Sequence, residues 1–136
     1  MITLVYVSAG RKRFDEAELS ALLAQCRRNN ESLGVTGMLL YADGNFMQAI
    51  EGDETVIDAL LEKIVGDPRH GQVRMLYRAP IAARHFAKWS MALRRLSDLP
   101  EADRQNCTSL VAARLTSADA EAMAATLLES FRRTMA

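Results

Sequence analysis

The chain has 136 residues, of which 49% are apolar and 25% charged, and this composition is typical of a single globular domain with its own core. Lysine plus arginine and aspartate plus glutamate both number 17, so no net charge attracts nucleic acid or a membrane surface. The N-terminal apolar run is too short for a signal peptide or a membrane span, and Cys26 and Cys107 lack the spacing of metal ligands. We therefore expect a cytoplasmic protein that contains no metal and binds neither nucleic acid nor membrane.

The first half of the chain predicts a strand, a helix and a hairpin. Residues 2–8 are rich in apolar and β-branched side chains, as in a strand. Residues 15–29 have the apolar spacing of an amphipathic helix, and Asp15 with Glu18 has the pattern of an N-terminal capping box. Two apolar runs then flank an Asp-Gly pair at positions 43–44, which is a strong signal for a two-residue hairpin turn.

The second half predicts another helix, two more strands and a helical tail. Residues 53–65 return to helical spacing before Gly66 and Pro68, and residues 72–80 and 87–96 have the composition of strands. The order β-α-β-β-α-β matches the ferredoxin-like split βαβ motif, with an antiparallel sheet in which the first and third strands are central. We therefore expect an α+β fold with a fifth strand added, two helices on one sheet face, and C-terminal helices on or near the other.

Residue parity assigns side chains to the two faces of the predicted sheet, because they alternate along a strand. On the first and third strands the odd-numbered Val5, Val7, Met47 and Ala49 are apolar, whereas the even-numbered residues include Tyr6, Ser8 and Gln48. We expect the even face to look toward the two helices, and the C-terminal helices or a partner to cover the odd face. A buried primary amide costs about 1 kcal/mol or more if left unbonded, so the Tyr6 hydroxyl is the expected partner of Gln48.

Further side chains converge on this layer between sheet and helices. Trp89 and Met91 lie two residues apart on the predicted fifth strand, and Asn29 and Asn30 lie at the end of the first predicted helix. No carboxylate pair, Ser/His/Asp set or Gly-rich phosphate loop accompanies them. Amides donate and accept hydrogen bonds at once, which suits a ring with alternating C=O and N–H groups. The set therefore favours binding of a planar heteroaromatic ligand over a chemical reaction.

Five blocks of the sequence resemble a known family when they are taken together. The blocks "LVYVS", "RRNNESLGVTGMLLY", "GNFMQAIEG", "DPRH" and "KWSM" are similar, in order and spacing, to those of BLUF domains, which sense blue light with a flavin. The resemblance runs from Met1 to about Leu93. It implies a flavin-binding sensor domain at residues 1–94 and a helical extension at residues 95–136 that packs on the sheet or contacts partners.

The resemblance also implies roles for individual residues. Tyr6 matches the tyrosine that gives an electron and a proton toward the excited flavin, and Gln48 matches the glutamine that rearranges between them. Trp89 and Met91 match two residues that exchange near that glutamine. The implied cofactor-binding residues are Ser8, Asn29, Asn30, Gln48, Lys63, Arg69 and His70. FAD is the cofactor that the resemblance implies, while FMN and riboflavin share the same ring and stay open.

The resemblance thus implies a blue-light photoreceptor that is not an enzyme. It would pass its signal through the fifth strand and the C-terminal helices to a downstream partner protein, and a homo-oligomer is expected. Two alternatives come from the residues alone. One is an acylphosphatase-like hydrolase that uses Arg11, Arg13 and Asn29, although no phosphate-binding loop precedes the first helix. The other is a ligand-free dimerisation module, in which each candidate residue is ordinary core, helix end or surface charge.

Overall fold

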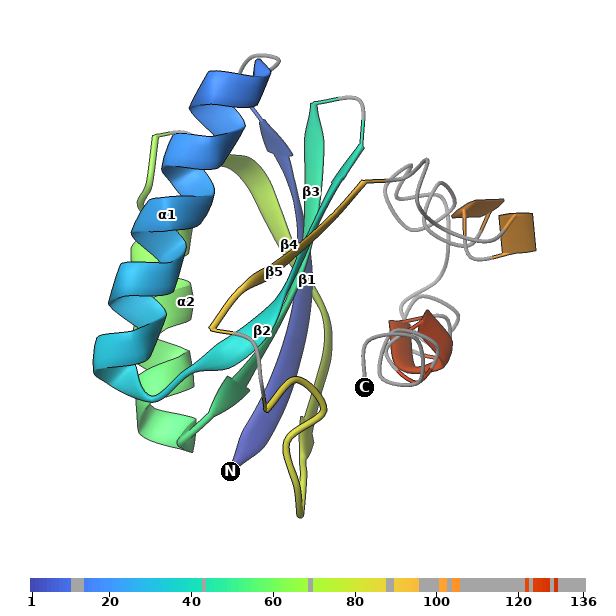
Figure 1. The fold of residues 1–136 in the computed structure, drawn as a ribbon. Coiled ribbons are helices and arrows are strands. Elements are labelled where there is room, and N and C mark those ends of the chain that lie inside the picture. Colours follow the sequence, from blue (N-terminus) through green and yellow to red (C-terminus); the bar gives the residue numbers. More distant parts are fainter. Residues whose placement is uncertain are drawn as a thin grey trace.

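The computed structural model describes residues 1–10, 14–42, 44–68, 70–87, 90–95, 101, 102, 104, 105, 122, 124–127 and 129. Its elements are β1 (Ile2–Gly10), α1 (Glu16–Leu33), β2 (Thr36–Ala42), β3 (Asn45–Gly52), α2 (Glu54–Val65), β4 (His70–Pro80) and β5 (Ala92–Arg95). The strands form one sheet in the order β4-β1-β3-β2-β5, and α1 and α2 lie on the same face of it (Figure 1). The expected α+β architecture, with β1 and β3 in the centre, is confirmed.

Helix α1 begins where the sequence predicts and ends later. Asp15 Oδ1 accepts from the backbone N–H of Glu18 at 2.7 Å, which is the expected capping box. The helix continues past Asn29 to Leu33, and the Asn30 side chain donates to the backbone carbonyl of Ser90 at 2.7 Å. Gly34 then ends the helix in the left-handed conformation with φ 68°, where glycine carries no steric penalty.

The register of the central strands brings the polar even-numbered side chains together. Strands β1 and β3 are antiparallel, with Leu4 opposite Ile50 and Tyr6 opposite Gln48. Strands β2 and β3 are antiparallel neighbours, with Ala42 opposite Asn45, and Gly44 just before β3 has φ 84°. The predicted hairpin is therefore present, and it sets the register of β3 against β2.

The fifth strand is shorter than predicted and pairs in parallel with β2, starting at Ala92 opposite Met38. The prediction that this strand contains Met91 is wrong, because the carbonyls of Ser90 and Met91 accept hydrogen bonds from the side chains of Asn30 and Arg27 and the strand begins at Ala92. The Glu51 carboxylate accepts from the backbone N–H groups of His85 and Phe86 at 2.8 and 2.7 Å, and Arg27 donates to the Met91 carbonyl.

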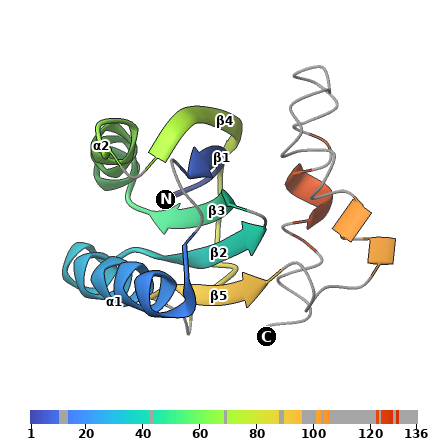
Figure 2. The same ribbon diagram turned by 90° about the horizontal axis from the view of Figure 1, so that it is seen from above.

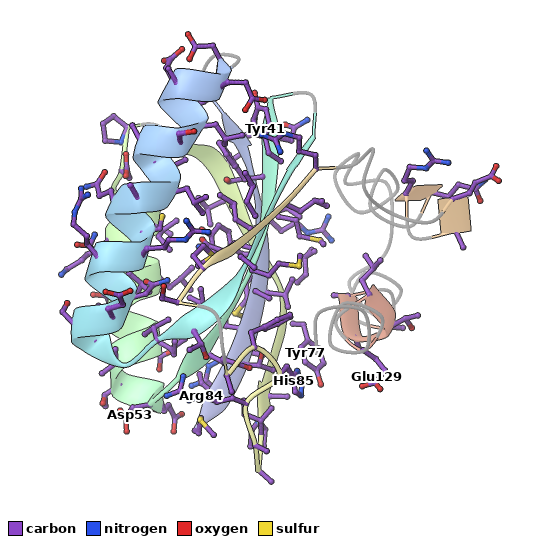
Figure 3. The ribbon with its side chains drawn as sticks, viewed as in Figure 1. Tyr41, Asp53, Tyr77, Arg84, His85 and Glu129 are labelled. Atoms are coloured by element: carbon purple, nitrogen blue, oxygen red, sulfur yellow. The ribbon has the colours of Figure 1, made fainter. Side chains whose placement is uncertain are left out.

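Arg84 and His85 are in the connection between β4 and β5, at the same end of the molecule as Asp53 (Figure 3). Arg84 donates to the hydroxyl of Thr36 at 2.8 Å and to the carbonyl of Gly34 at 2.6 Å. The hydroxyl of Thr36 in turn donates to Glu51 at 2.8 Å. These bonds hold the connection against the ends of β2 and β3.

Each face of the sheet has its own hydrophobic core, as the parity of β1 and β3 predicts. The core between sheet and helices includes Leu4, Tyr6, Phe46, Ile50, Leu19, Leu22, Ile57 and Met91. The core on the far face includes Val5, Val7, Met47, Ala49, Ala124 and Leu127. Ala124 and Leu127 are each 1% exposed, and Figure 2 shows their segment on the side opposite to α1 and α2. The C-terminal segment therefore covers part of the far face, as expected.

Candidate functional site

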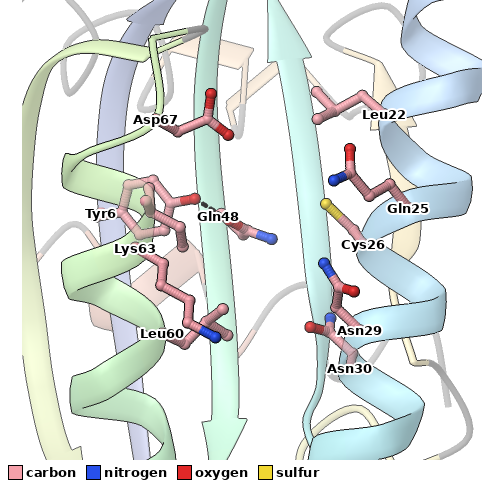
Figure 4. Close-up of a pocket in the computed structure, with 11 residues that line it drawn as sticks. Tyr6, Leu22, Gln25, Cys26, Asn29, Asn30, Gln48, Leu60, Lys63 and Asp67 are labelled. Carbon is pink, nitrogen blue, oxygen red and sulfur yellow. Dashed lines mark hydrogen bonds between the residues drawn. The ribbon is translucent and has the colours of Figure 1, made fainter.

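A pocket of about 220 Å³ opens between α1 and α2, over the even face of the sheet. Figure 4 shows side chains of α1 facing those of α2 across it, with Tyr6 and Gln48 forming its floor. Its lining residues are Tyr6, Leu22, Gln25, Cys26, Asn29, Asn30, Gln48, Leu60, Lys63, Ile64 and Asp67. The pocket therefore combines aliphatic walls with several amides, a phenol, an ammonium group and a carboxylate.

Tyr6 and Gln48 are hydrogen-bonded to each other at the bottom of the pocket. The Tyr6 side chain is fully buried, and its hydroxyl donates to Oε1 of Gln48. Burial raises the pKa of the Tyr6 phenol well above its ordinary value, and Coulomb interactions with Cys26 and Asp67 raise it further. Tyr6 therefore keeps its proton at physiological pH and acts as a hydrogen-bond donor.

The second partner of Gln48 favours the same amide orientation. Gln48 Nε2 donates to the Met91 sulfur at 3.5 Å, and a thioether can accept a hydrogen bond but has no proton to donate. Oε1 toward Tyr6 and Nε2 toward Met91 is thus the arrangement that pairs each donor with an acceptor. Gln48 is 5% exposed, and these two bonds satisfy its carbonyl oxygen and one of its N–H groups inside the core.

The structure brings together most, but not all, of the residues singled out in the sequence. One pocket is lined by Tyr6, Gln48, Asn29, Asn30 and Lys63. The Met91 sulfur accepts a hydrogen bond from Gln48 at the edge of this set. The remaining candidates are placed elsewhere or lie outside the description. Ser8 is buried on the same face of β1 but lines a separate pocket with Asn45 and Gln72. Arg69, Trp89 and the side chain of His70 lie outside the described residues, as do Arg11, Arg13 and Cys107.

Several lining residues were not singled out in the sequence. On α1, the residues Leu22, Gln25 and Cys26 precede Asn29 at helical spacing. Leu60, Ile64 and Asp67 surround Lys63 with the same spacing at the other wall. Positions i, i+3, i+4 and i+7 share one helix face, so extending this row from Asn29 and from Lys63 would have found the lining residues of both helices. Asp67 lies beyond the end of α2.

The donor and acceptor groups of the pocket fit the pyrimidine edge of a flavin. Gln48 uses one N–H for Met91, and its amide faces the space between the helices (Figure 4). Asn29 and Asn30 lie along the α1 wall and Lys63 along the α2 wall. Amides and an ammonium group can together bind alternating C=O and N–H groups, and the aliphatic side chains suit the faces of a ring.

Two other kinds of site were sought within the described part of the chain. No group of three or more His, Cys, Asp or Glu side chains there could hold a metal ion. Among these same residues, no helix combines the length and the apolar character needed to cross a bilayer.

Comparison with known proteins identifies the family. The family model described as "Sensors of blue-light using FAD" matches residues 1–92. The chain therefore belongs to the BLUF family, which confirms the resemblance seen in the sequence. The matched domain is a sensor and not an enzyme.

Relatives that are named as subunits of photoactivated enzymes match the same region of the chain. The beta subunit of a photoactivated adenylate cyclase from Euglena longa is 37% identical over 92 residues, which are 67% of this chain and 11% of that subunit. The alpha subunit from Euglena gracilis is 36% identical over 86 residues, or 63% of this chain and 8% of the subunit. The chain thus spans about a tenth of the length of these relatives.

Solved structures share the fold over most of the chain. The dark-state structure of BlrB, a BLUF protein, has a TM-score of 0.78 and 30% identity, and the match covers 98% of this chain and 96% of that one. BlsA in its photo-activated state has a TM-score of 0.74 and 25% identity, covering 93% of this chain and 94% of that one. A bacterial light-regulated adenylyl cyclase matches with a TM-score of 0.68 and 29% identity, over 96% of this chain and 36% of that one.

Proposed function

We propose that this chain is a blue-light photoreceptor whose switch is the Tyr6–Gln48 pair. The observation that carries the proposal is the bond from the buried Tyr6 hydroxyl to Gln48 Oε1 on the floor of a pocket lined by amides. A bound flavin would supply the absorption of blue light and an excited state that accepts an electron. The protein supplies a phenol that can give up that electron and an amide that can rearrange.

The proposed cycle leaves the protein with the same atoms and electrons but different hydrogen bonds. With a flavin bound, Tyr6 would give up an electron and would pass its proton through Gln48, and both would then return to Tyr6. The Gln48 amide would be left rotated or tautomerised, with a different hydrogen bond to the bound ring. A stronger hydrogen bond to the ring would shift its absorption slightly to the red. Gln48 is therefore the local element with two arrangements.

We propose FAD as the cofactor, with its ring in the pocket and the rest of the molecule outside. The volume of about 220 Å³ is below the ~300–1,000 Å³ of sites that enclose drug-sized ligands, so it suits a ring system better than a whole dinucleotide. FMN and riboflavin carry the same ring and would meet the same side chains. Asn29, Asn30, Gln48 and Lys63 are the proposed ring contacts. Roles for Ser8, Arg69 and His70 stay predictions.

The proposed sensor domain spans residues 1–94, and residues 95–136 form the proposed output segment. Contact of Ala124 and Leu127 with the far face of the sheet supports this division. The signal would pass through β5 and this segment to a downstream partner protein, with Met91 between the photosite and β5. A role for Trp89 stays a prediction. Relatives named as adenylate cyclases are consistent with a signalling partner or effector. A homo-oligomer and a location in the cytoplasm stay predictions.

The test is an absorption spectrum of the purified protein in darkness and under blue light, after reconstitution with FAD. We expect flavin bands that shift slightly to the red and return in darkness. Flavin that binds but bleaches would contradict the Tyr6–Gln48 switch. Colourless protein that hydrolyses an acyl phosphate would instead favour the hydrolase alternative, and colourless, inert protein would favour the dimerisation module.

A further inference from the structure

Helix α1 holds the chain segment immediately before β5 with three side chains. Arg27 Nε donates to the carbonyl of Met91 at 2.9 Å, and Asn30 Nδ2 donates to the carbonyl of Ser90 at 2.7 Å. The Ser90 hydroxyl lies 3.5 Å from Glu31 Oε1 and donates to it. Residues 27, 30 and 31 share one side of the helix, since they are three and four positions apart.

These contacts decide where the Met91 sulfur lies. The Met91 side chain is fully buried and accepts from Gln48 Nε2 at 3.5 Å, while its backbone carbonyl accepts from Arg27. Ladder pairing with β2 begins only at the next residue, Ala92. Met91 is thus held by α1 through its backbone and presented to Gln48 through its side chain.

Arg27 differs from Asn30 in its relation to the pocket. Asn30 lines the pocket, so its substitution would disturb ligand binding and the position of Ser90 together. Arg27 is exposed and does not line the pocket. Its Nε–H group reaches the Met91 carbonyl as a charge-assisted hydrogen bond, which is stronger than one between neutral groups.

We infer that Arg27 is a positioning residue for the light switch, acting through Met91 on the orientation of the Gln48 amide. This inference rests on the proposed photoreceptor function. With Nε2 directed at the sulfur, the anchored Met91 stabilises the arrangement in which Tyr6 donates to Oε1. A rearranged amide that turned its N–H away from the sulfur would lose this contact, so the anchor would favour the dark arrangement alone. Loss of the anchor therefore removes part of the free energy that drives return to darkness.

The test compares Arg27→Met with Arg28→Met in the full chain loaded with FAD. Arg28 is the adjacent exposed arginine of the same helix, so its substitution removes the same charge without the Met91 contact. We expect Arg27→Met to bind flavin normally and to recover in darkness about threefold more slowly or more, which corresponds to about 0.65 kcal/mol in the activation free energy. Arg28→Met should return to the dark state at the wild-type rate. Arg27→Lys keeps a hydrogen-bond donor, so its dark recovery should be slowed less than that of Arg27→Met.

A double-mutant cycle tests whether Arg27 acts through the Met91 sulfur. Arg27→Met is introduced into wild type and into Met91→Leu, which keeps the backbone carbonyl but removes the sulfur acceptor. The slowing should disappear in the Met91→Leu background. Equal slowing in both backgrounds, or unchanged or faster recovery of Arg27→Met in the wild-type background, would overturn the inference. If wild type shows no red shift at all, the proposed function itself fails and the inference fails with it.

Discussion

Tyr6 and Gln48 lie directly opposite each other on the antiparallel strands β1 and β3, and the Tyr6 hydroxyl donates a hydrogen bond to Gln48 Oε1. The two residues are 42 positions apart in the sequence, so the strand register creates the pair. A slip of β3 by one residue would turn Gln48 to the far face and Met47 to the pocket, because side chains alternate along a strand. The candidate switch therefore depends on the pairing of the two central strands.

Removing the Tyr6 hydroxyl should abolish the red shift without removing the flavin. Tyr6→Phe keeps the ring that packs in the core, and it deletes the donor to Gln48 and the group proposed to lose the proton. Difference spectra before and after blue light provide the measurement. Tyr77→Phe is the matched control, since Tyr77 packs against the core on the far face, and it should photocycle normally. Normal photocycling of Tyr6→Phe would exclude the proposed switch.

Gln48→Leu should likewise bind flavin and show no red shift. Leucine has a similar volume and removes the amide that links Tyr6 to Met91. Because the two residues act as one unit, the double variant with Tyr6→Phe should behave like either single variant. Flavin content and the difference spectrum of all three variants check this expectation. A residual shift in the Gln48→Leu spectrum would show that another group rearranges.

The raised pKa of Tyr6 predicts a loss of stability at alkaline pH. Below the unfolded-state pKa of about 10 the phenol is protonated in both states, so its contribution is fully present there. Above that pH the unfolded chain loses the proton first, and the free energy of unfolding falls as pH rises toward the higher folded-state pKa. Denaturant unfolding between about pH 9 and 11 should show a smaller decrease for Tyr6→Phe than for wild type. Equal decreases would mean that Tyr6 is not protected by burial.

The buried carboxylate of Glu51 should be important for stability. It is 1% exposed and accepts from the Thr36 hydroxyl and from the N–H groups of His85 and Phe86. Glu51→Leu leaves all three donors without this acceptor, which should cost about 3 kcal/mol or more in the free energy of unfolding. Urea unfolding measures the effect, and the exposed Glu62→Gln should change it by less than about 0.5 kcal/mol. A loss of similar size in both variants would contradict this role.

Gly37 should tolerate no larger residue. A Cβ at this position would clash with the backbone carbonyl oxygen of Ala49 on the neighbouring strand. Gly37→Ala must therefore shift β2 away from β3, and we expect a loss of about 2 kcal/mol or more in the free energy of unfolding. Gly71→Ala is the control, since its Cβ would meet its nearest atom at 3.6 Å, an ordinary contact. Equal unfolding midpoints for Gly37→Ala and wild type would show that the strands have room to move.

The sequence alone determined the helices, most strands and the division of β1 and β3 into two faces. These features follow from local patterns, because capping, turn chemistry and the periods of helix and strand involve residues close together in the chain. For this reason the prediction was correct that the even-numbered side chains of β1 and β3 face the helices and the odd-numbered ones face away from them. The chemical character of these residues alone indicated only a planar ring as the ligand. The resemblance of the sequence blocks to a known family then indicated a flavin.

Only the tertiary structure decided where β5 begins and which side chains complete the pocket. Glu51 bonds His85 from 34 residues away, and Arg27 bonds Met91 from 64 residues away. Such bonds remove backbone groups from the strand ladder, yet the local composition of residues 87–91 still resembles a strand. Cys26 and Asp67 meet Tyr6 in the same way, through the packing of α1 and α2 on one sheet. Contacts at these sequence separations exist only after the sheet has formed, so no local pattern encodes them.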